Sequence, residues 1–235
     1  WGWSPRSGWE PGIVRVTFLD VGQGDATILE LPDGQTVLID AGPAYRRLDM
    51  GRAVIGPYLW NQVIRRLDHV VATHPQWDHV GGLPWVLHTF EVGDYWSNGV
   101  SRSERFFHQL QSAVKSAGLQ EQSIAAGTDI ISAGPCSLTV LSPPRRQEIG
   151  SYVSTTVSSG TDLNNRSLVT RLECGNHSFL LTADAEQDAL DELLNIPNGL
   201  LARLVKVPHH GAGSSLHREW VNRLQAEAMV LSVGT

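Results

Sequence analysis

Two histidines and an aspartate lie within one six-residue segment of the chain. His74, Asp78 and His79 follow directly on an apolar stretch with the composition of a β-strand. Imidazole nitrogens and carboxylate oxygens together suit Zn²⁺ or Mn²⁺, and no cysteine lies nearby to favour a softer metal. A loop that leaves a strand end can bring three such side chains to one point, so the spacing predicts a metal site. A polar loop that merely contains two histidines is the alternative.

Carboxylates stand at the ends of two other apolar stretches. Asp40 follows residues 37–39, and Asp184 follows residues 180–183. An ionised group at the mouth of a buried strand costs free energy unless it is paired or coordinated. Both residues are therefore candidates for the same polar centre, although Asp184 also suits the cap of a following helix.

Two adjacent histidines follow a further apolar stretch. His209 and His210 come directly before Gly211, again where a predicted strand ends. The chain has only nine histidines, so such adjacency is rare by chance. A structural histidine is the alternative for whichever of the pair points away from the centre. Together the strand-end loops predict one coherent metal site.

The elements that must position these residues are short strands and helices in two batches. Strands are expected at residues 14–19, 26–31, 36–39 and 69–72, then at 138–141, 168–173, 178–181, 203–207 and 229–233. Helices are expected at residues 53–66, 83–90, 104–117, 186–194 and 216–225. The first three strands, joined by tight turns, form an antiparallel meander. This order predicts a layered α/β sandwich rather than an alternating parallel sheet.

Residues 13–235 are predicted to form one domain, because 235 residues can bury a sizeable core. Residues 1–12, with three tryptophans, two prolines and three glycines, are interpreted as a linker or docking tail. The polar residues 143–165 are predicted to be a mobile loop. No apolar run approaches the roughly 18 residues of a membrane helix, and no signal peptide is recognised. The piece is therefore expected to be soluble, and because it opens on Trp1 it is expected to be a fragment or a processed form.

Charge and cysteine content narrow the function classes. The net charge of −6 argues weakly against a broad basic surface that grips duplex DNA. Arg145, Arg146 and Arg166 supply local positive potential beside the predicted loop. Cys136 and Cys174 are too few to define a disulfide framework. Two buried small side chains are the preferred interpretation of this pair, and a single disulfide is the alternative.

The histidine segment and five further strings resemble a known family. The spacing His74-x-Gln76-x-Asp78-His79 resembles the H-x-[HD]-x-D-H signature of the metallo-β-lactamase superfamily. More narrowly, residues 18–26, 38–42, 165–169, 180–184 and 206–211, in that order, resemble the extramembrane hydrolase domain of the competence protein ComEC. The resemblance covers nearly the whole chain.

This resemblance implies a four-layer αββα metallo-β-lactamase sandwich with metals at one edge. It implies a divalent-metal nuclease with two ions, Mn²⁺ or Zn²⁺, in which a metal-activated water attacks the phosphodiester of DNA. The implied setting is the extracytoplasmic side of the cytoplasmic membrane, attached to the membrane channel domain of the same full-length protein. There it would degrade the strand that is not imported during competence DNA uptake. A small-molecule ligand is not expected.

The resemblance also assigns roles to individual residues. The implied metal ligands are His74 and Asn165 at the first site, Asp78, His79 and one of His209 and His210 (slightly favouring His210) at the second, and Asp184 as the bridge. The implied catalytic or orienting residues are Asp40, Asp78, Asp184 and Lys206, with a plain surface lysine as the alternative for Lys206. The implied substrate-binding residues are Gln23, Gly24, Asp25 and Ser167, with a tight turn as the alternative for the glycine loop.

Three features depart from the family pattern. Gln76 replaces the usual His or Asp, and with Asn165 it leaves the first metal short of charged ligands. Ala183 stands where glycine commonly precedes the bridging aspartate, and the chain stops at Thr235, before a Gly-His-Pro segment, so its end is expected to be truncated. Two alternatives follow: a related metallo-hydrolase of a small ester or phosphodiester, and a non-catalytic DNA-binding or assembly domain with an incomplete metal site.

Overall fold

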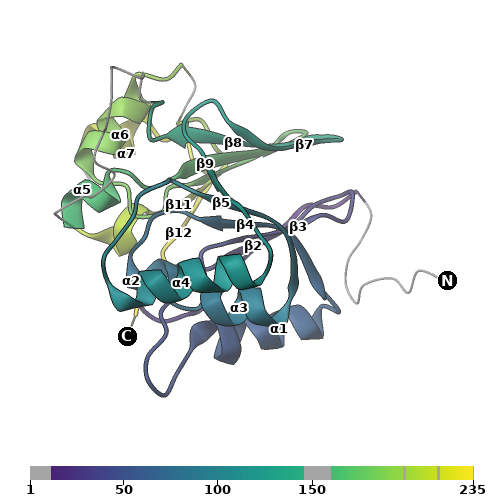
Figure 1. The fold of residues 1–235 in the computed structure, drawn as a ribbon. Coiled ribbons are helices and arrows are strands. Elements are labelled where there is room, and N and C mark those ends of the chain that lie inside the picture. The colour runs from purple at the N-terminus through teal and green to yellow at the C-terminus, as the bar shows by residue number, and fades with distance from the viewer. Residues whose placement is uncertain (1–11, 146–159, 198–199, 216–217, 235) are drawn as a thin grey trace.

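The computed structural model describes residues 12–145, 160–197, 200–215 and 218–234. The predicted tail therefore lies almost wholly outside the described residues. Within them, no helix is long and apolar enough to cross a membrane. The described chain forms two six-stranded sheets with helices on their outer faces (Figure 1).

The first sheet has the strand order β1-β2-β3-β4-β5-β6. Its strands are β1 (Arg15–Phe18), β2 (Thr27–Glu30), β3 (Thr36–Ile39), β4 (Arg66–Ala72), β5 (Glu91–Ser97) and β6 (Glu121–Ser123). The first three strands pair antiparallel, as predicted, and from β3 onward neighbouring strands are parallel. Parallel strands end at the same edge of a sheet, so the loops after β3 and β4 leave side by side.

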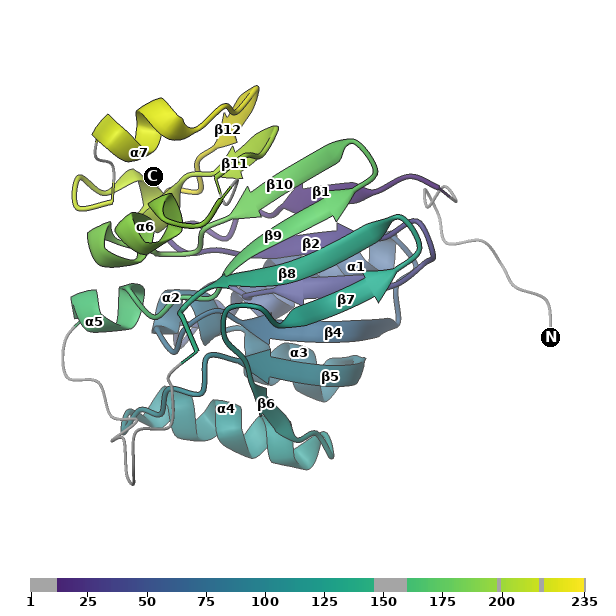
Figure 2. The same cartoon turned by 90° about the horizontal axis from the view of Figure 1, so that it is seen from above.

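The second sheet has the order β12-β11-β10-β9-β8-β7, which Figure 2 shows from above. Its strands are β7 (Asp129–Ala133), β8 (Cys136–Ser142), β9 (Val169–Cys174), β10 (His177–Leu181), β11 (Leu204–Lys206) and β12 (Ala228–Val230). Strands β7 to β10 pair antiparallel, whereas β10, β11 and β12 are parallel. The loops after β10 and β11 therefore also leave one edge together.

Helices cover the outer face of each sheet (Figure 1). The first sheet carries α1 (Gly56–Asn61), α3 (Leu83–Thr89) and α4 (Arg105–Ser116), with the π-helical turn η1 (Gly51–Ile55) before α1. The second sheet carries α6 (Gln187–Leu194) and α7 (Arg218–Arg223), and two short helices, α2 (Trp77–Val80) and α5 (Gly160–Asn164), lie in connecting loops. The predicted four-layer αββα sandwich is confirmed.

Three apolar clusters separate the four layers. Neighbouring residues of one strand serve different clusters: Ile28 packs toward the helices of the first sheet, whereas Leu29 packs between the sheets. Leu180 of the second sheet packs toward α6 and α7, whereas Leu181 packs between the sheets. Side chains of a strand alternate between faces, and both faces are covered here. This is why the central strands are continuously apolar in sequence.

The structure corrects several expected elements. The helix expected at residues 53–66 stops at Asn61, because Val63 adopts a left-handed backbone (φ 58°) and β4 starts at Arg66. Strands β5, β6 and β7 were not predicted. In the expected loop at 143–165, residues 160–164 form helix α5, and residues 146–159 lie outside the described part of the chain.

Cys136 and Cys174 form a disulfide, so the preferred interpretation as two free buried side chains is wrong. The two residues are directly opposite each other on the antiparallel strands β8 and β9. Both are buried and belong to the cluster between the sheets. The bond closes a loop with a sequence separation of 38 residues, which includes the segment before α5.

Removal of this disulfide is expected to lower the free energy of unfolding by about 2–4 kcal/mol, because the open loop regains chain entropy in the unfolded state. The change is the double substitution Cys136→Ala/Cys174→Ala, measured by urea unfolding. Reduction of the wild-type protein should give a similar loss, whereas reducing agent should leave the variant unchanged. A variant as stable as the oxidised wild type would contradict this expectation.

Candidate metal centre

The predicted site residues lie on loops at the ends of parallel strands. Asp40 follows β3 and His74 follows β4 on the first sheet, whereas Asp184 follows β10 on the second. His209 and His210 form part of a 3-10 turn, η2 (Pro208–Gly211), after β11. Because each pair of parallel strands ends at one edge, the four loops converge there.

These loops hold an unusual backbone conformation. Five described non-glycine residues have positive φ, and four of them are Asp40, Ala183, His209 and His210, at 57°, 47°, 44° and 53°. Such conformations are disfavoured for residues with a Cβ and concentrate at functional sites. The left-handed backbone at Ala183 also gives a physical reason for the glycine that the family pattern places there.

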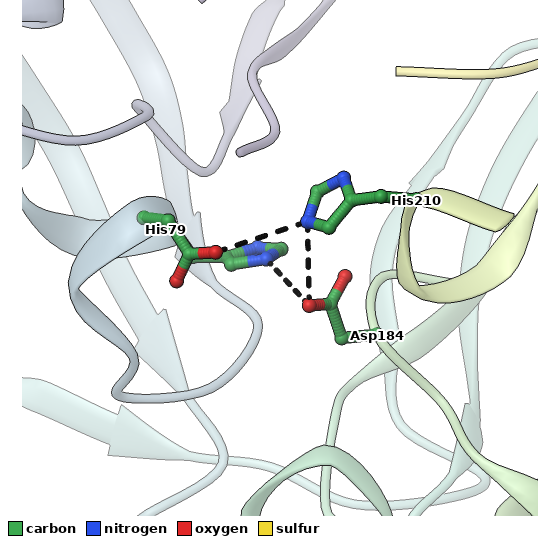
Figure 3. A group of neighbouring side chains, drawn as sticks. His79, Asp184 and His210 are labelled. Atoms are coloured by element: carbon green, nitrogen blue, oxygen red, sulfur yellow. Dashed lines mark ion pairs between the residues drawn. The ribbon is translucent and has the colours of Figure 1, made fainter. Parts of the chain in front are cut away.

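Four side chains offer one ligand atom each to a common point. These atoms of Asp78, His79, Asp184 and His210 all lie within 4.8 Å of one another. Oδ2 of Asp184 is 3.1 Å from Nε2 of His79 and 3.4 Å from Nε2 of His210. Figure 3 shows these three side chains, from α2, the loop after β10 and η2, pointing toward one another. Nε2 of His210 is also 3.8 Å from Oδ2 of Asp78.

The rings of His79 and His210 are oriented by contacts at Nδ1, the ring nitrogen that faces away from the common point. Nδ1 of His79 is 2.7 Å from Oδ2 of Asp40, a buried carboxylate. Nδ1 of His210 is 3.0 Å from the carbonyl oxygen of Ser232, to which it can donate. An outer partner of this kind fixes the tautomer and the ring orientation of a metal-ligating histidine. Both Nε2 atoms are thereby directed at the common point.

The polar atoms at this point fit a divalent cation. Nε2 of His74, His79 and His210 and both carboxylate oxygens of Asp184 are buried, and apart from the ion pairs of Asp184 with its neighbours in the centre they have no hydrogen-bond partner among the described residues. Buried polar atoms are costly unless another group satisfies them, which a bound cation would do. A set of imidazole nitrogens and carboxylate oxygens without sulfur suits Mn²⁺ or Zn²⁺.

His74 lies beside the cluster and Asn165 does not. The His74 ring is fully buried, and its centroid is 4.3 Å from that of His79. The Asn165 side chain donates to Oδ2 of Asp188 at 3.2 Å and accepts from the backbone N–H of Ala189 at 3.2 Å. The Asn165 amide therefore hydrogen-bonds to the first turn of α6, and the structure does not place this side chain at the centre as a ligand.

Lys206 is buried, so the alternative of a plain surface lysine is wrong. Its ammonium forms an ion pair with Asp25 and donates to the carbonyl oxygen of Ala183 at 3.1 Å. It also lies 3.9 Å from Oδ1 of Asp184. Two carboxylates and a carbonyl offset the desolvation of this buried charge. Lys206 thus supports Asp184 from inside the protein.

The four expected substrate-binding residues differ in their exposure to solvent. Gln23 is exposed, and its Oε1 accepts from the N–H of Gly234 at 3.2 Å. Gly24 is buried with φ 133°, and a Cβ there would overlap the carbonyl oxygen of Asp78. Asp25 is paired with Lys206, and Ser167 is fully buried. In this arrangement only Gln23 of the four presents a side chain to solvent.

Glu186 is a further polar residue beside the centre that the sequence analysis did not predict. Oε1 of Glu186 accepts from Nδ2 of Asn164 at 2.8 Å and lies 3.1 Å from Nδ1 of His209. Nε2 of His209 remains 3.9 Å from Oδ2 of Asp184, which places His209 on the side of the cluster. The signal was available: Glu186 is a second carboxylate two residues after Asp184.

The mutual charges of the cluster shift several pKa values. Burial lowers the pKa of His79, but the Asp184 and Asp40 carboxylates outweigh it and hold this pKa well above 6.5. Burial raises the pKa of Asp184, but His79 and His210 hold it well below 3.8. Burial and then His79 lower the pKa of His74 to about 3. For His210, burial lowers the pKa, but Asp184 outweighs it and the net shift is upward.

Metal binding at pH 7 is therefore expected to release about one to two protons. With raised pKa values, His79 and His210 hold their protons below the folded-state pKa, and each proton must leave before Nε2 can bind a cation. Apparent affinity should accordingly rise with pH and level off above those values. Calorimetric titration with Mn²⁺ in two buffers of different ionisation enthalpy counts the protons. His88→Gln, at an exposed histidine of α3, should leave the count unchanged; zero release by the wild type would contradict the expectation.

Comparison with known proteins agrees with this geometry. Residues 19–234 match the family model described as metallo-beta-lactamase superfamily. ComE operon protein 3 of Bacillus subtilis is 27% identical over 232 residues, covering 94% of this chain and 28% of that protein. Competence protein ComA of Neisseria gonorrhoeae is 24% identical over 222 residues, with coverages of 94% and 27%. The chain thus spans about a quarter of the length of these curated relatives.

A solved structure shares the fold. A mutant of CmlA beta-hydroxylase superposes with a TM-score of 0.53 at 17% identity, over 96% of this chain and 47% of that one. The αββα layers, the His-x-Gln-x-Asp-His segment after β4 and the match over most of the sequence agree. The chain belongs to the metallo-β-lactamase superfamily.

Proposed function

We propose that this protein is a divalent-metal-dependent deoxyribonuclease, the nuclease domain of a competence DNA-uptake protein that degrades the strand not imported. The observation that carries the proposal is the convergence of Asp78, His79, Asp184 and His210 on one point. The inward atoms of His79, Asp184 and His210 are also buried and, among the described residues, have no hydrogen-bond partner outside the cluster. Members of the superfamily are mostly metal-dependent hydrolases. The relative named as a competence protein supports DNA as the substrate.

One complete set of ligands and one partial set are available for cations. Asp78, His79, Asp184 and His210 would hold one ion, and His74 with Asp184 would begin a second, weaker site. When bound, a divalent ion supplies charge stabilisation for the phosphate and a water acidic enough to ionise near neutral pH. Two ions are the proposal, with Mn²⁺ or Zn²⁺ as the candidates.

The other residues of the centre keep this ligand set in place. Asp40 fixes the ring of His79 through Nδ1, and the Ser232 carbonyl fixes His210 in the same way. The Lys206 ammonium lies 3.9 Å from Oδ1 of Asp184, whereas the two histidines approach Oδ2. The ligands therefore need little rearrangement before a phosphodiester arrives, which lowers the reorganisation required for catalysis.

The disulfide supports the proposed placement outside the cytoplasm. Disulfides form and persist in oxidising compartments and are rare in the cytosol. Cys136 and Cys174 are bonded to each other, and the described part of the chain has no free cysteine. Since the chain spans about a quarter of its curated relatives, we propose that its partner is the membrane channel domain of the same full-length protein.

The proposal is tested by titrating Mn²⁺ and Zn²⁺ against cleavage of labelled single- and double-stranded DNA. Wild-type protein should cleave only with added metal, and Asp78→Ala should not cleave. Asp33→Ala, in the exposed turn at the opposite end of the first sheet, is the matched control and should cleave normally. Equal cleavage by the wild type and Asp78→Ala would refute the proposal. A chromogenic phosphodiester as competitor separates a nuclease from an enzyme for small diesters.

A second candidate is a non-catalytic DNA-binding domain with a single metal. Two observations favour it: Asn165 is engaged by α6, and Gln76 offers only a neutral amide. Mass spectrometry of the metal content after dialysis separates the two functions when it is combined with the cleavage assay. One equivalent of metal together with DNA binding and no cleavage would favour this candidate.

A further inference from the structure

An exposed turn contacts α2, the short helix that carries the candidate ligands Asp78 and His79. After Asp40 the chain forms a hairpin-like turn, in which the backbones of Tyr45 and Leu48 hydrogen-bond to each other and Ala44 pairs with Asp49. The four residues at its tip, Tyr45 to Leu48, are all exposed, with Tyr45 at 52% and Leu48 at 46%. This segment is called the Tyr45–Leu48 turn below.

The turn is fixed to the helix that carries two candidate ligands. Nε1 of Trp77 donates to the carbonyl oxygen of Ala44 at 3.0 Å, and the rings of Tyr45 and Trp77 pack edge to face with centroids 4.3 Å apart. The backbone of Ala44 lies so close to Gly81 that a Cβ at Gly81 would overlap it. Since Trp77 directly precedes Asp78, the turn is held next to the ligand set.

Two adjacent arginines of the turn have no ion-pair partner among the described residues. Arg46 and Arg47 are exposed and make no hydrogen bond or ion pair with any described residue. By contrast, Arg66 and Arg203, which are also exposed, are each paired with acidic side chains. In a chain of net charge −6, a pair of unneutralised guanidinium groups beside the centre is a local positive feature.

We propose that the Tyr45–Leu48 turn binds a single-stranded nucleic acid and leads it to the metal centre. Guanidinium groups bind phosphates strongly and in a directed way, so Arg46 and Arg47 contact the backbone of the strand. Tyr45, half exposed and braced by Trp77, stacks on an unpaired base. Stacking needs a splayed base, which selects a single strand over a duplex. The inference rests on the proposed nuclease function and names the surface that this function requires.

The test measures binding of a fluorescent oligothymidine by anisotropy, in EDTA and over a series of salt concentrations. Arg46→Ala/Arg47→Ala should weaken binding at least about tenfold and reduce the slope of log K against log[salt] by about 1.4, or 0.7 for each lost phosphate contact. Tyr45→Ala should weaken binding about fivefold or more with the slope unchanged. Arg65→Ala/Lys115→Ala is the matched control, because it removes two exposed cations that make no ion pair with any described residue and lie away from the turn.

The outcomes separate this surface from the nuclease activity. If Arg46→Ala/Arg47→Ala matches the control in both affinity and slope, the turn is not a nucleic-acid surface. Thermal melting of each variant checks folding. The arginine variant and the control should melt with the wild type because their altered side chains are exposed, whereas Tyr45→Ala loses the contact with Trp77 and should melt slightly lower but remain folded at the assay temperature. The binding assay contains no metal, so it measures this surface independently of cleavage. Wild-type protein that binds the oligonucleotide through this turn but does not cleave it after Mn²⁺ or Zn²⁺ is added would contradict the proposed function alone.

Discussion

Asp184→Asn is expected to lower metal-dependent DNA cleavage by at least about a hundredfold and to remove most of the bound metal. The Asp184 carboxylate contacts most of the other groups of the centre. Its Oδ2 faces Nε2 of both His79 and His210, and its Oδ1 faces Lys206. Loss of an outer-shell partner already reduces metal affinity or activity 10- to 100-fold in metalloenzymes, and loss of a shared ligand should do at least as much. Metal content by mass spectrometry and cleavage of labelled DNA measure the two effects.

The asparagine keeps the size of the side chain but removes its charge, so the comparison isolates electrostatics and ligation. Asp188→Asn makes the same change four residues further along, at an exposed position of α6, and should leave metal content and cleavage near the wild-type values. Full metal occupancy in Asp184→Asn would show that the ion binds elsewhere. Normal cleavage without retained metal would contradict the proposed function.

The parts of the fold that were predictable are those with a strong local pattern. Strands β2, β3, β4 and β10 are apolar on both faces because each lies between two cores, and such runs are recognisable in sequence. Strands β5 and β6 were missed because they carry charged and polar residues; β6, an edge strand, reads Glu-Gln-Ser. These segments become strands through pairing with a neighbour, which periodicity alone does not reveal.

The site was predictable where chemistry coincides with strand ends. Asp40, His74 and Asp184 each follow an apolar stretch, and parallel strands bring such positions to one edge. The burial and the contact partners of the other site residues were not predictable. The alternative of a surface lysine for Lys206 was wrong because its burial depends on Asp25, which is 181 positions earlier in the chain. The amide of Asn165 was likewise assigned by position, whereas its partners on α6 are visible only in three dimensions.

Asp40→Ala is expected to destabilise the metal-free protein by roughly 3–5 kcal/mol, the range for breaking a buried pair by removing one partner. The Asp40 carboxylate accepts the N–H of Thr73 at 2.8 Å and its hydroxyl at 2.6 Å, besides facing Nδ1 of His79 at 2.7 Å. Alanine leaves all of these donors buried without an acceptor and also strains the left-handed backbone at this position (φ 57°). Urea unfolding in EDTA measures the loss.

Asp40 also positions a ligand, so its removal should weaken metal binding in protein that is still folded. Without the carboxylate, His79 can rotate or change tautomer, and the dissociation constant for Mn²⁺ should rise about 10- to 100-fold. Asp40→Asn is the matched control for backbone strain, because asparagine tolerates positive φ and keeps one acceptor oxygen. It should recover part of the stability but less of the metal affinity, since the charge that holds a proton on Nδ1 of His79 is gone. If Asp40→Ala were destabilised but bound Mn²⁺ as tightly as the wild type, Asp40 would stabilise the loop without orienting the histidine.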